Sequence, residues 1–406
     1  MTASALSHLE CSRCSSRYDA DKVAQLCTCG APLLARYDLQ RARATLTRDT
    51  LRERERTMWR YAELLPVRDL DERVCVQETM TPIVALPRIG SSVGIDALFV
   101  KDESTLPTGS FKARGAAVGV SRARELGVRG FAMPTNGNAG AAWSAYAARA
   151  GMEAYVVMPR DAPAISRLEC SMAGAHLWLV DGLIGDAGRV VAELVKRYGL
   201  FDASTLKEPY RIEGKKTMGF ELTEQFEWDP PEVVLYPTGG GVGIIGMHKA
   251  LRELHAVGIV GERMPRFVAV QAQGCAPIVR AWNARERTSM PWEGAHTAAY
   301  GINVAKALGD FLVLDALYDS GGAAQAVSDD ELLQAQRDVC AREGVLLCPE
   351  GAATLAAAKK LKKSGWIRDG ERVLLINTGT GLKYSDVPHE DPPVLARGEV
   401  PTLSDR

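Results

Sequence analysis

The chain has 406 residues, a formal net charge of −1 and an apolar share of 46%, which is ordinary for a globular protein. A chain of this length folds into two or three units with a large core. Because the charge is balanced and no apolar run approaches the roughly 20 residues of a membrane helix, we expect neither a nucleic-acid partner nor a membrane partner. The N-terminal residues lack a basic region followed by an apolar run, so we expect no secretory signal and a cytoplasmic location.

The N-terminal segment, residues 1–36, is rich in cysteine and is predicted to form a small zinc-ribbon-like unit. Cys11 and Cys14 form one close pair, and Cys27 and Cys29 form a second. Four thiolates suit a tetrahedral, structural Zn²⁺, and a metal would stabilise a unit too small to hold itself together by apolar burial. The second pair is C-x-C rather than C-x-x-C, so free, reduced thiols remain the alternative. The other five of the nine cysteines are scattered, which argues against a disulfide framework.

Residues 37–406 are predicted to form the main body. Residues 51–64 are highly charged and predict a helix with a solvated face. From about residue 95, short apolar runs alternate with Ala-rich segments of helical spacing. The predicted strands are 97–100, 130–133, 154–158, 177–180, 233–236, 266–270 and 373–376, and the predicted helices are 139–151, 165–174, 187–198, 244–255, 328–342 and 350–362. This alternation predicts an α/β fold with open, mainly parallel sheet, in which ligands bind beyond the carboxyl ends of the strands.

A lysine stands between a predicted strand and a predicted helix, in the sequence PTGSFKARG of residues 107–115. Burial and a helix N-terminus both disfavour the charged form of Lys112 and so lower its pKa. A neutral amine can attack an aldehyde and form a Schiff base. Taken alone, a lysine after a Gly-Ser turn is most often a solvated surface charge.

Three further motifs each follow a predicted strand. Residues 135–140 (TNGNAG) offer backbone N–H groups to a carboxylate and an Asn side chain to a ring hydroxyl, although an Asn-Gly turn is the alternative. Residues 238–243 (TGGGVG) let backbone N–H groups converge on a phosphate, and they match neither a P-loop nor a dinucleotide fingerprint. Residues 377–383 (NTGTGLK) offer a hydroxyl to an unprotonated pyridine nitrogen, or form a polar turn.

The four motifs, in this order, resemble the threonine synthase branch of the fold-type II pyridoxal-phosphate (PLP) enzymes, which are relatives of tryptophan synthase β. The resemblance extends over about residues 81–384. It implies two open-sheet α/β domains with PLP in the cleft between them, the smaller half lying at about residues 130–210. It also implies a homodimer that acts on a small amino-acid substrate.

The resemblance also implies a role for each motif residue. Lys112 is the catalytic, Schiff-base lysine. The other cofactor-binding residues are Phe111 beside the ring, Asn138 at the ring 3-oxygen, Gly239, Gly240, Gly241 and Gly243 at the phosphate, and Thr378 at the pyridine nitrogen, with Thr380 as a second choice. The substrate-binding residues are Thr135, Asn136 and Gly137 at the carboxylate, and Arg211, with Lys207, Lys215 or Lys216 as other sources of the cation that a substrate phosphate requires.

The implied reaction is that of threonine synthase, in which O-phospho-L-homoserine and water give L-threonine and phosphate. The TGTGLK spelling at residues 378–383 favours it. Ala113, the all-Gly/Val loop at 239–243 and the sequence TLKE at 205–208 are untypical, and they favour a serine/threonine dehydratase or another β-elimination or β-replacement enzyme. A non-catalytic PLP-binding relative is the remaining alternative, and the retained Lys112 and Thr378 argue against it.

Overall fold

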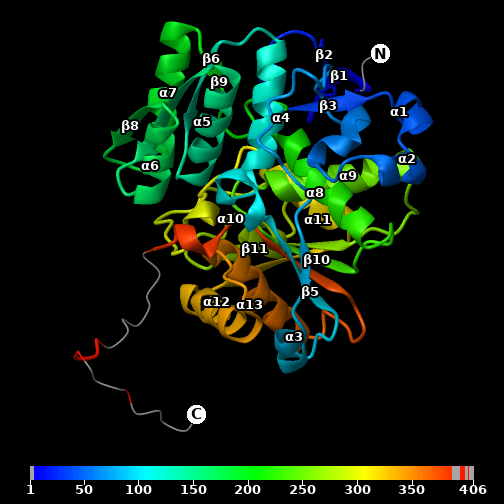
Figure 1. The fold of residues 1–406 in the computed structure, drawn as a ribbon, viewed down its shortest axis with the longest axis vertical. Helices are drawn as coiled ribbons and strands as arrows, with labels where there is room; N and C mark the ends of the chain where they lie inside the picture. The colour runs from blue at the N-terminus through cyan, green and yellow to red at the C-terminus, as the bar shows by residue number, and fades with distance from the viewer. Residues whose placement is uncertain (1–3, 386–393, 398–400, 402–406) are drawn as a thin grey trace.

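The computed structural model describes residues 4–385, 394–397 and 401. In this part of the chain, the strands form a six-stranded, a four-stranded and a three-stranded sheet. Figure 1 shows the four-stranded sheet and the three-stranded N-terminal sheet at one end of the molecule and the six-stranded sheet at the other. The long helix α4 (Lys112–Glu125) lies between the two upper sheets in this view. The predicted α/β fold is confirmed.

The six-stranded sheet has the order β12-β11-β10-β13-β5-β4 and is parallel except for β4 at its edge. Its strands are β4 (Ile83–Ala85), β5 (Leu98–Asp102), β10 (Val233–Pro237), β11 (Arg266–Ala272), β12 (Ala323–Val327) and β13 (Val373–Asn377). The central strands β10 and β13 are buried at every residue, as expected of parallel strands covered on both faces. Alternate residues of β10 join two different apolar clusters, because successive side chains point to opposite faces.

Helices cover both faces of this sheet. Helix α13 (Pro349–Lys363) supplies small apolar residues to one cluster, and α8 (Arg211–Gln225) and α9 (Val242–Ala256) supply the other. The remaining helices around it are α3 (Pro87–Val93), α10 (Pro277–Asn283), α11 (Asp310–Asp319) and α12 (Asp329–Glu343), with the short turns η2 (Glu103–Thr105), η3 (Pro107–Gly109), η4 (Tyr300–Ile302) and η5 (Gly381–Lys383). The capping box predicted at Ser328 and Glu331 opens α12.

The four-stranded sheet is parallel throughout, with the order β8-β7-β6-β9. Its strands are β6 (Gly130–Pro134), β7 (Glu153–Pro159), β8 (His176–Val180) and β9 (Phe201–Asp202), and its helices are α5 (Asn138–Ala150), α6 (Ala164–Met172) and α7 (Ile184–Tyr198). Helix α7 packs on one face of the sheet through a small cluster with Ala187 and Val191. Helix α5 buries Trp143 in the larger cluster that also holds α4.

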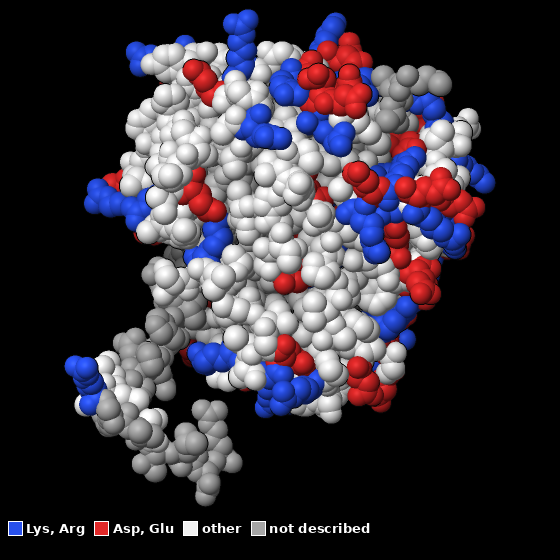
Figure 2. Space-filling model, in the orientation of Figure 1, with Lys and Arg blue, Asp and Glu red and all other residues white. Residues whose placement is uncertain are grey.

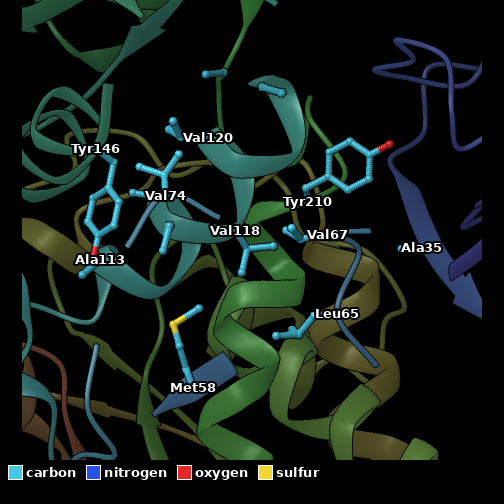
Figure 3. Close-up of a cluster of buried hydrophobic side chains, with 14 of the residues drawn as sticks. Ala35, Met58, Leu65, Val67, Val74, Ala113, Val118, Val120, Tyr146 and Tyr210 are labelled. Carbon is cyan, nitrogen blue, oxygen red and sulfur yellow. The ribbon is translucent and has the colours of Figure 1, made fainter. Parts of the chain in front are cut away.

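The N-terminal sheet is antiparallel, with the order β2-β1-β3, and consists of β1 (Leu6–Cys11), β2 (Arg17–Tyr18) and β3 (Leu33–Tyr37). Its apolar residues belong to the same cluster as those of α4 and α5. Figure 3 shows part of this cluster, with Ala35 of β3, Leu65, and Val118 and Val120 of α4. The N-terminal residues therefore share their core with the main body.

The prediction of a solvated helix over residues 51–64 is wrong. Helices α1 (Leu39–Thr45) and α2 (Arg48–Glu53) end before the buried 3-10 segment η1 (Met58–Leu64) begins. Arg52, Glu53, Glu55 and Arg56 are exposed as predicted. The other charged side chains have inward partners: Arg54 Nη2 lies 2.6 Å from Glu63 Oε1, and Arg60 Nη2 lies 3.0 Å from Glu224 Oε1. The charged composition predicted that the whole segment is exposed, but the ion pairs hold Arg60 and Glu63 in the interior.

Acidic and basic side chains are interspersed on the face shown in Figure 2, as the balanced net charge indicates. None of the helices in the described segments is long and apolar enough to span a membrane.

A buried ion network lies at the centre of the main body. Arg114 of α4 donates to Glu103, with 2.5 Å between Nε and Oε2, and to Glu221 of α8, with 2.5 Å between Nη1 and Oε1. Lys101 of β5 lies 3.0 Å from Glu221, and all four side chains are fully buried. Burial alone would raise the pKa of Glu221, but Arg114 and Lys101 outweigh burial and lower that pKa to about 2. The network joins a strand and two helices.

Replacing Arg114 tests the importance of this network. Arg114→Met leaves two buried carboxylates short of a partner and is expected to lower the free energy of unfolding by about 3–5 kcal/mol. Arg252→Met is the matched control, because Arg252 pairs with Asp319 at the surface and such pairs contribute about 0–1 kcal/mol. Urea denaturation measures both, and equal losses in the two variants would refute a special role for the network.

Candidate active site

A cavity of about 370 Å³ lies beyond the carboxyl ends of strands from both large sheets, which is within the range of about 300–1,000 Å³ for small-molecule sites. All four motifs reach it: one follows β5, one β6, one β10 and one β13. The predicted site residues that line it are Phe111, Lys112, Thr135, Asn136, Gly137, Asn138, Arg211, Gly239, Gly240, Gly241 and Thr378. The parallel strand arrangement brings these distant segments together.

Lys112 is the first residue of α4, and a backbone crossing fixes the segment before it. The N–H of Phe111 donates to Thr378 O at 3.0 Å, and the N–H of Thr380 donates to Gly109 O at 2.9 Å. The Lys112 amine lies 3.9 Å from the centroid of the Phe111 ring. The amine therefore has a defined place next to an aromatic face.

The surroundings of Lys112 favour its neutral form. Burial lowers the pKa of the Lys112 amine, the carboxylate of Glu350 raises it, and the charge of Arg211 lowers it again, so that it falls to about 8. A sizeable share of the amine is then neutral near neutral pH, whereas an exposed lysine is almost wholly charged. A neutral amine is the form that attacks a carbonyl group.

The motif after β6 forms a tight turn into α5. Thr135 Oγ1 accepts hydrogen bonds from the N–H groups of Gly137 at 3.0 Å and Gly140 at 3.2 Å. Gly137 has φ of 149°, and a Cβ atom there would lie 2.9 Å from Ser166 Oγ, so only glycine fits. The amide oxygen of Asn138 is buried and has no hydrogen-bond partner among the described residues. It is therefore available to a ligand in the cavity.

The glycine loop after β10 ends at the start of α9. Gly241 has φ of 77° and no side chain caps the helix, so the first N–H groups of α9 have no acceptor within the helix. A Cβ atom at Gly241 would lie 2.2 Å from Val313 Cγ2, and one at Gly239 would lie 2.8 Å from Gly301 O. Gly243 lies in the first turn of α9 and does not line the cavity. Its Cα faces the ring of Tyr236. This helix N-terminus is suited to a phosphate.

The structure distinguishes between the two threonine candidates after β13. Thr378 lines the cavity, and its hydroxyl lies 3.6 Å from the buried thiol of Cys348. Thr380 does not line the cavity, and its hydroxyl accepts a hydrogen bond from the N–H of Leu382 at 3.2 Å. Of the two threonines, Thr378 is thus the one that lines the cavity.

Several cavity residues were missed as site residues, among them Glu350, Tyr300 and Tyr384. Glu350 is buried and accepts hydrogen bonds from the Tyr384 hydroxyl at 2.6 Å and from the Gly301 N–H at 2.7 Å. Tyr300 stacks on Tyr384, with 4.7 Å between the ring centroids. Glu350 stands out in the sequence as an acid opening an Ala-rich helix, whereas Tyr300 lies in an irregular segment and gives no signal.

Arg211 lines the cavity from the first turn of α8. Its Nε lies 2.7 Å from Glu208 Oε1, and its Nη1 donates to Thr205 Oγ1 at 3.2 Å. Glu208 therefore fixes the direction of the guanidinium and compensates part of its charge.

The residues present fit PLP. Lys112 offers an amine that reacts with an aldehyde, Phe111 an apolar ring face, and Asn138 an unpartnered amide oxygen. The glycine loop offers free N–H groups, and Thr378 offers a hydroxyl. Each of these groups matches one part of the cofactor.

The four N-terminal cysteines form a second cluster. Their sulfur atoms all lie within 4.8 Å of one another, with 3.5 Å between Cys11 and Cys29 and 3.5 Å between Cys14 and Cys27. A tetrahedral zinc site with bonds of about 2.3 Å places its sulfurs about 3.8 Å apart. A hydrogen bond from the backbone of Cys29 and one from the Tyr18 hydroxyl lower the pKa of the Cys27 thiol to about 6. The cluster has the dimensions of a four-thiolate metal site.

Comparison with known proteins agrees with this geometry. A family model described as pyridoxal-phosphate dependent enzyme matches residues 74–379. The chain is 37% identical over 377 residues to a threonine synthase of Methanocaldococcus jannaschii, covering 93% of each chain. It is 35% identical over 378 residues to a threonine synthase of Methanosarcina acetivorans, covering 93% of this chain and 92% of the relative.

Among solved structures, maize serine racemase is similar in fold, with a TM-score of 0.67 and 24% sequence identity over 83% of this chain and 94% of the other. Family match, curated relatives and fold agree: the chain belongs to the pyridoxal-phosphate-dependent enzymes, in their threonine synthase branch.

Proposed function

We propose that this chain is a PLP-dependent lyase with threonine synthase activity, converting O-phospho-L-homoserine and water into L-threonine and phosphate. The observation that carries the proposal is the 37% identity to a threonine synthase across 93% of both chains. The cavity supports it, because it joins a low-pKa lysine to a cation that a substrate phosphate requires.

The predicted site residues that line the cavity have distinct roles in this reaction. When bound, PLP supplies an electron sink that spreads the negative charge left at Cα after proton loss. Lys112 Nζ holds the cofactor, takes the Cα proton and returns it, and its lowered pKa suits both directions of transfer. The turn formed by Thr135, Asn136 and Gly137 holds the substrate carboxylate, and Arg211 holds the phosphate.

Water has to be kept out until the phosphate has left. We assign this to closure of the smaller α/β half, at about residues 130–210, onto the larger half. The cavity is lined from both, with Asn136 on one side and Gly240 on the other. We further propose, from the family resemblance, that the enzyme is a cytoplasmic homodimer.

A serine/threonine dehydratase is the second candidate. The observation that favours it is the buried Glu208 carboxylate on Arg211, which reduces the net positive charge available to a substrate phosphate. Ala113, by contrast, is buried in α4 and does not line the cavity, so it does not discriminate between substrates.

Product analysis tests the proposed function. The holoenzyme is expected to release phosphate from O-phospho-L-homoserine with L-threonine as the product, and to form little keto acid from L-threonine or L-serine. Assays of phosphate, threonine and keto acid on one preparation measure the two activities. Keto acid without phosphate release would assign the chain to the dehydratases.

The pH dependence of cofactor attachment tests the role of Lys112. The rate at which PLP binds covalently to the apoenzyme is expected to rise with pH, with a midpoint near 8, because only the neutral amine reacts. Since the Glu350 carboxylate raises the pKa of Lys112, Glu350→Gln should move the midpoint to lower pH. Absorbance of the attached cofactor follows the rate, and Lys112→Ala, the control, should show none. A midpoint near 10.5 would contradict a buried, low-pKa amine.

We also propose that Cys11, Cys14, Cys27 and Cys29 bind one structural Zn²⁺ in an N-terminal unit spanning residues 1–36. Four thiolates fill the tetrahedral coordination shell and leave no position for substrate, so the metal has no part in the reaction. The spacing of the four sulfurs supports this proposal.

Metal analysis tests the zinc proposal. The purified protein is expected to contain about one zinc per chain. Cys14→Ser should lose the metal, whereas Cys340→Ser, which changes an exposed cysteine of α12 outside the cluster, should keep it. Fully folded wild-type protein without zinc would refute the proposal.

A further inference from the structure

Lys215 is a buried lysine that lines the cavity and forms no ion pair with any described residue. Its exposed fraction is 2%. Its amine donates to the backbone carbonyl of Phe111 and lies 4.0 Å from the centroid of the Phe111 ring. A lysine amine carries up to three donors, and one hydrogen bond leaves it unsatisfied.

Three other lysines at or near the cavity already have acidic partners. Lys207 lies 2.9 Å from Asp202, and Lys306 lies 2.5 Å from Asp310. Lys216, next to Lys215 in the sequence, lies 2.5 Å from Glu213 and 2.8 Å from Glu253, and it does not line the cavity. The sequence offers four basic residues for a substrate phosphate, and two of them, Lys207 and Lys216, are thus paired with carboxylates outside the cavity lining.

The crossing of α4 and α8 places Lys215 beside the reacting centre. A Cβ atom at Gly115 would lie 3.0 Å from Lys215 Cε, and one at Gly214 would lie 2.0 Å from Arg114 O, so both positions require glycine. The helices therefore approach closely, and Lys215 and Lys112 lie within 4.0 Å of the same ring centroid. Arg211 and Lys215 stand four residues apart, on one face of α8.

The charges around Lys215 disfavour protonation of its amine. Burial lowers the pKa of Lys215 most, and the charges of Lys112, Arg211 and Arg114 lower it further. The carboxylate of Glu103 raises it, but the pKa stays well below 10.5. A dianion arriving between Lys215 and Arg211 reverses this balance, because an opposite charge nearby favours the charged amine.

We propose that Lys215 is a specificity-determining residue that binds, together with Arg211, the phosphate group of the substrate. This inference rests on the proposed function and assigns the second cation of the phosphate subsite. By linkage, binding of a dianionic ligand then raises the protonated share of Lys215, so the protein takes up protons. An amine that only supported the Phe111 carbonyl would take up none.

Calorimetry on the holoenzyme measures this proton. The probe is L-2-amino-5-phosphonopentanoate, which keeps the chain length and dianion of O-phosphohomoserine but has no bond that breaks. Titrations in buffers of different ionisation enthalpy give the number of protons taken up. The wild type is expected to take up protons beyond any uptake by the phosphonate itself, to a limit of about one per chain.

Lys215→Gln removes the charge but keeps a donor for the Phe111 carbonyl. It is expected to abolish the uptake and to raise the Kd of the phosphonate by about 10- to 100-fold. L-2-Aminopentanoate, which lacks the phosphonate, should bind the variant as it binds the wild type. Lys207→Gln is the matched control, because it removes a cation outside the cavity and should leave both quantities unchanged.

Three outcomes decide between the possibilities. Unchanged Kd and proton uptake in Lys215→Gln overturn the inference, as does equal weakening of both ligands, which marks a structural role. The absorbance of the bound cofactor shows that the variant keeps Lys112 in place. A wild type that binds the phosphonate but releases no phosphate from O-phosphohomoserine refutes the proposed function alone, since the subsite is then present without the reaction.

Discussion

The ion network around Arg114 is the constraint on which the site depends. Arg114 lies two residues after Lys112 on α4, and its guanidinium is held by Glu103 after β5 and by Glu221 of α8. An unpaired charge in the protein interior is costly, so α4 has one favourable position against the sheet and α8. Rotation or sliding of α4 would move the Lys112 amine away from Phe111 and Glu350. The reactive group is thereby positioned by groups that do not line the cavity.

Glycines also shape the site, because they allow close contact between helices and a tight turn into α9. Gly115 and Gly214 let α4 and α8 approach until side chains from both helices share the Phe111 ring, and Gly241 turns the chain so that the first N–H groups of α9 are free. Close helix contact also concentrates basic groups, because Lys112, Arg211 and Lys215 all lie on one wall. Such a wall favours an anionic ligand and disfavours protonation of its own amines.

Much of this could be predicted from the sequence. Every predicted strand overlaps an observed one, because buried parallel strands have continuous apolar runs in their sequences. In the main body, strands β4, β9 and β12 were missed, because β4 and β9 are very short and β12 (AAQAV) has no long apolar run. No strand was predicted within the N-terminal ribbon, where β1, β2 and β3 lie. The four motifs were placed correctly at strand ends because small polar residues and glycine mark those turns.

The rest depends on tertiary contacts that no local pattern encodes. Neighbouring lysines at 215 and 216 look alike in the sequence, and only the packing of α8 against α4 and α9 turns one to the cavity and the other to Glu213 and Glu253. Glu350 was predicted as the start of a helix and received no role, because its partners Tyr384 and Gly301 come from distant segments.

The position of β13 has a consequence for biosynthesis. It is the last strand of the described chain, yet it lies in the middle of the six-stranded sheet, between β10 and β5. While the nascent chain emerges from the ribosome, both of those strands keep an unpaired apolar edge until residues 373–377 have been made. The same late segment supplies the carbonyl that receives the N–H of Phe111. Synthesis must therefore reach residue 377 before the central sheet is protected from pairing with another chain.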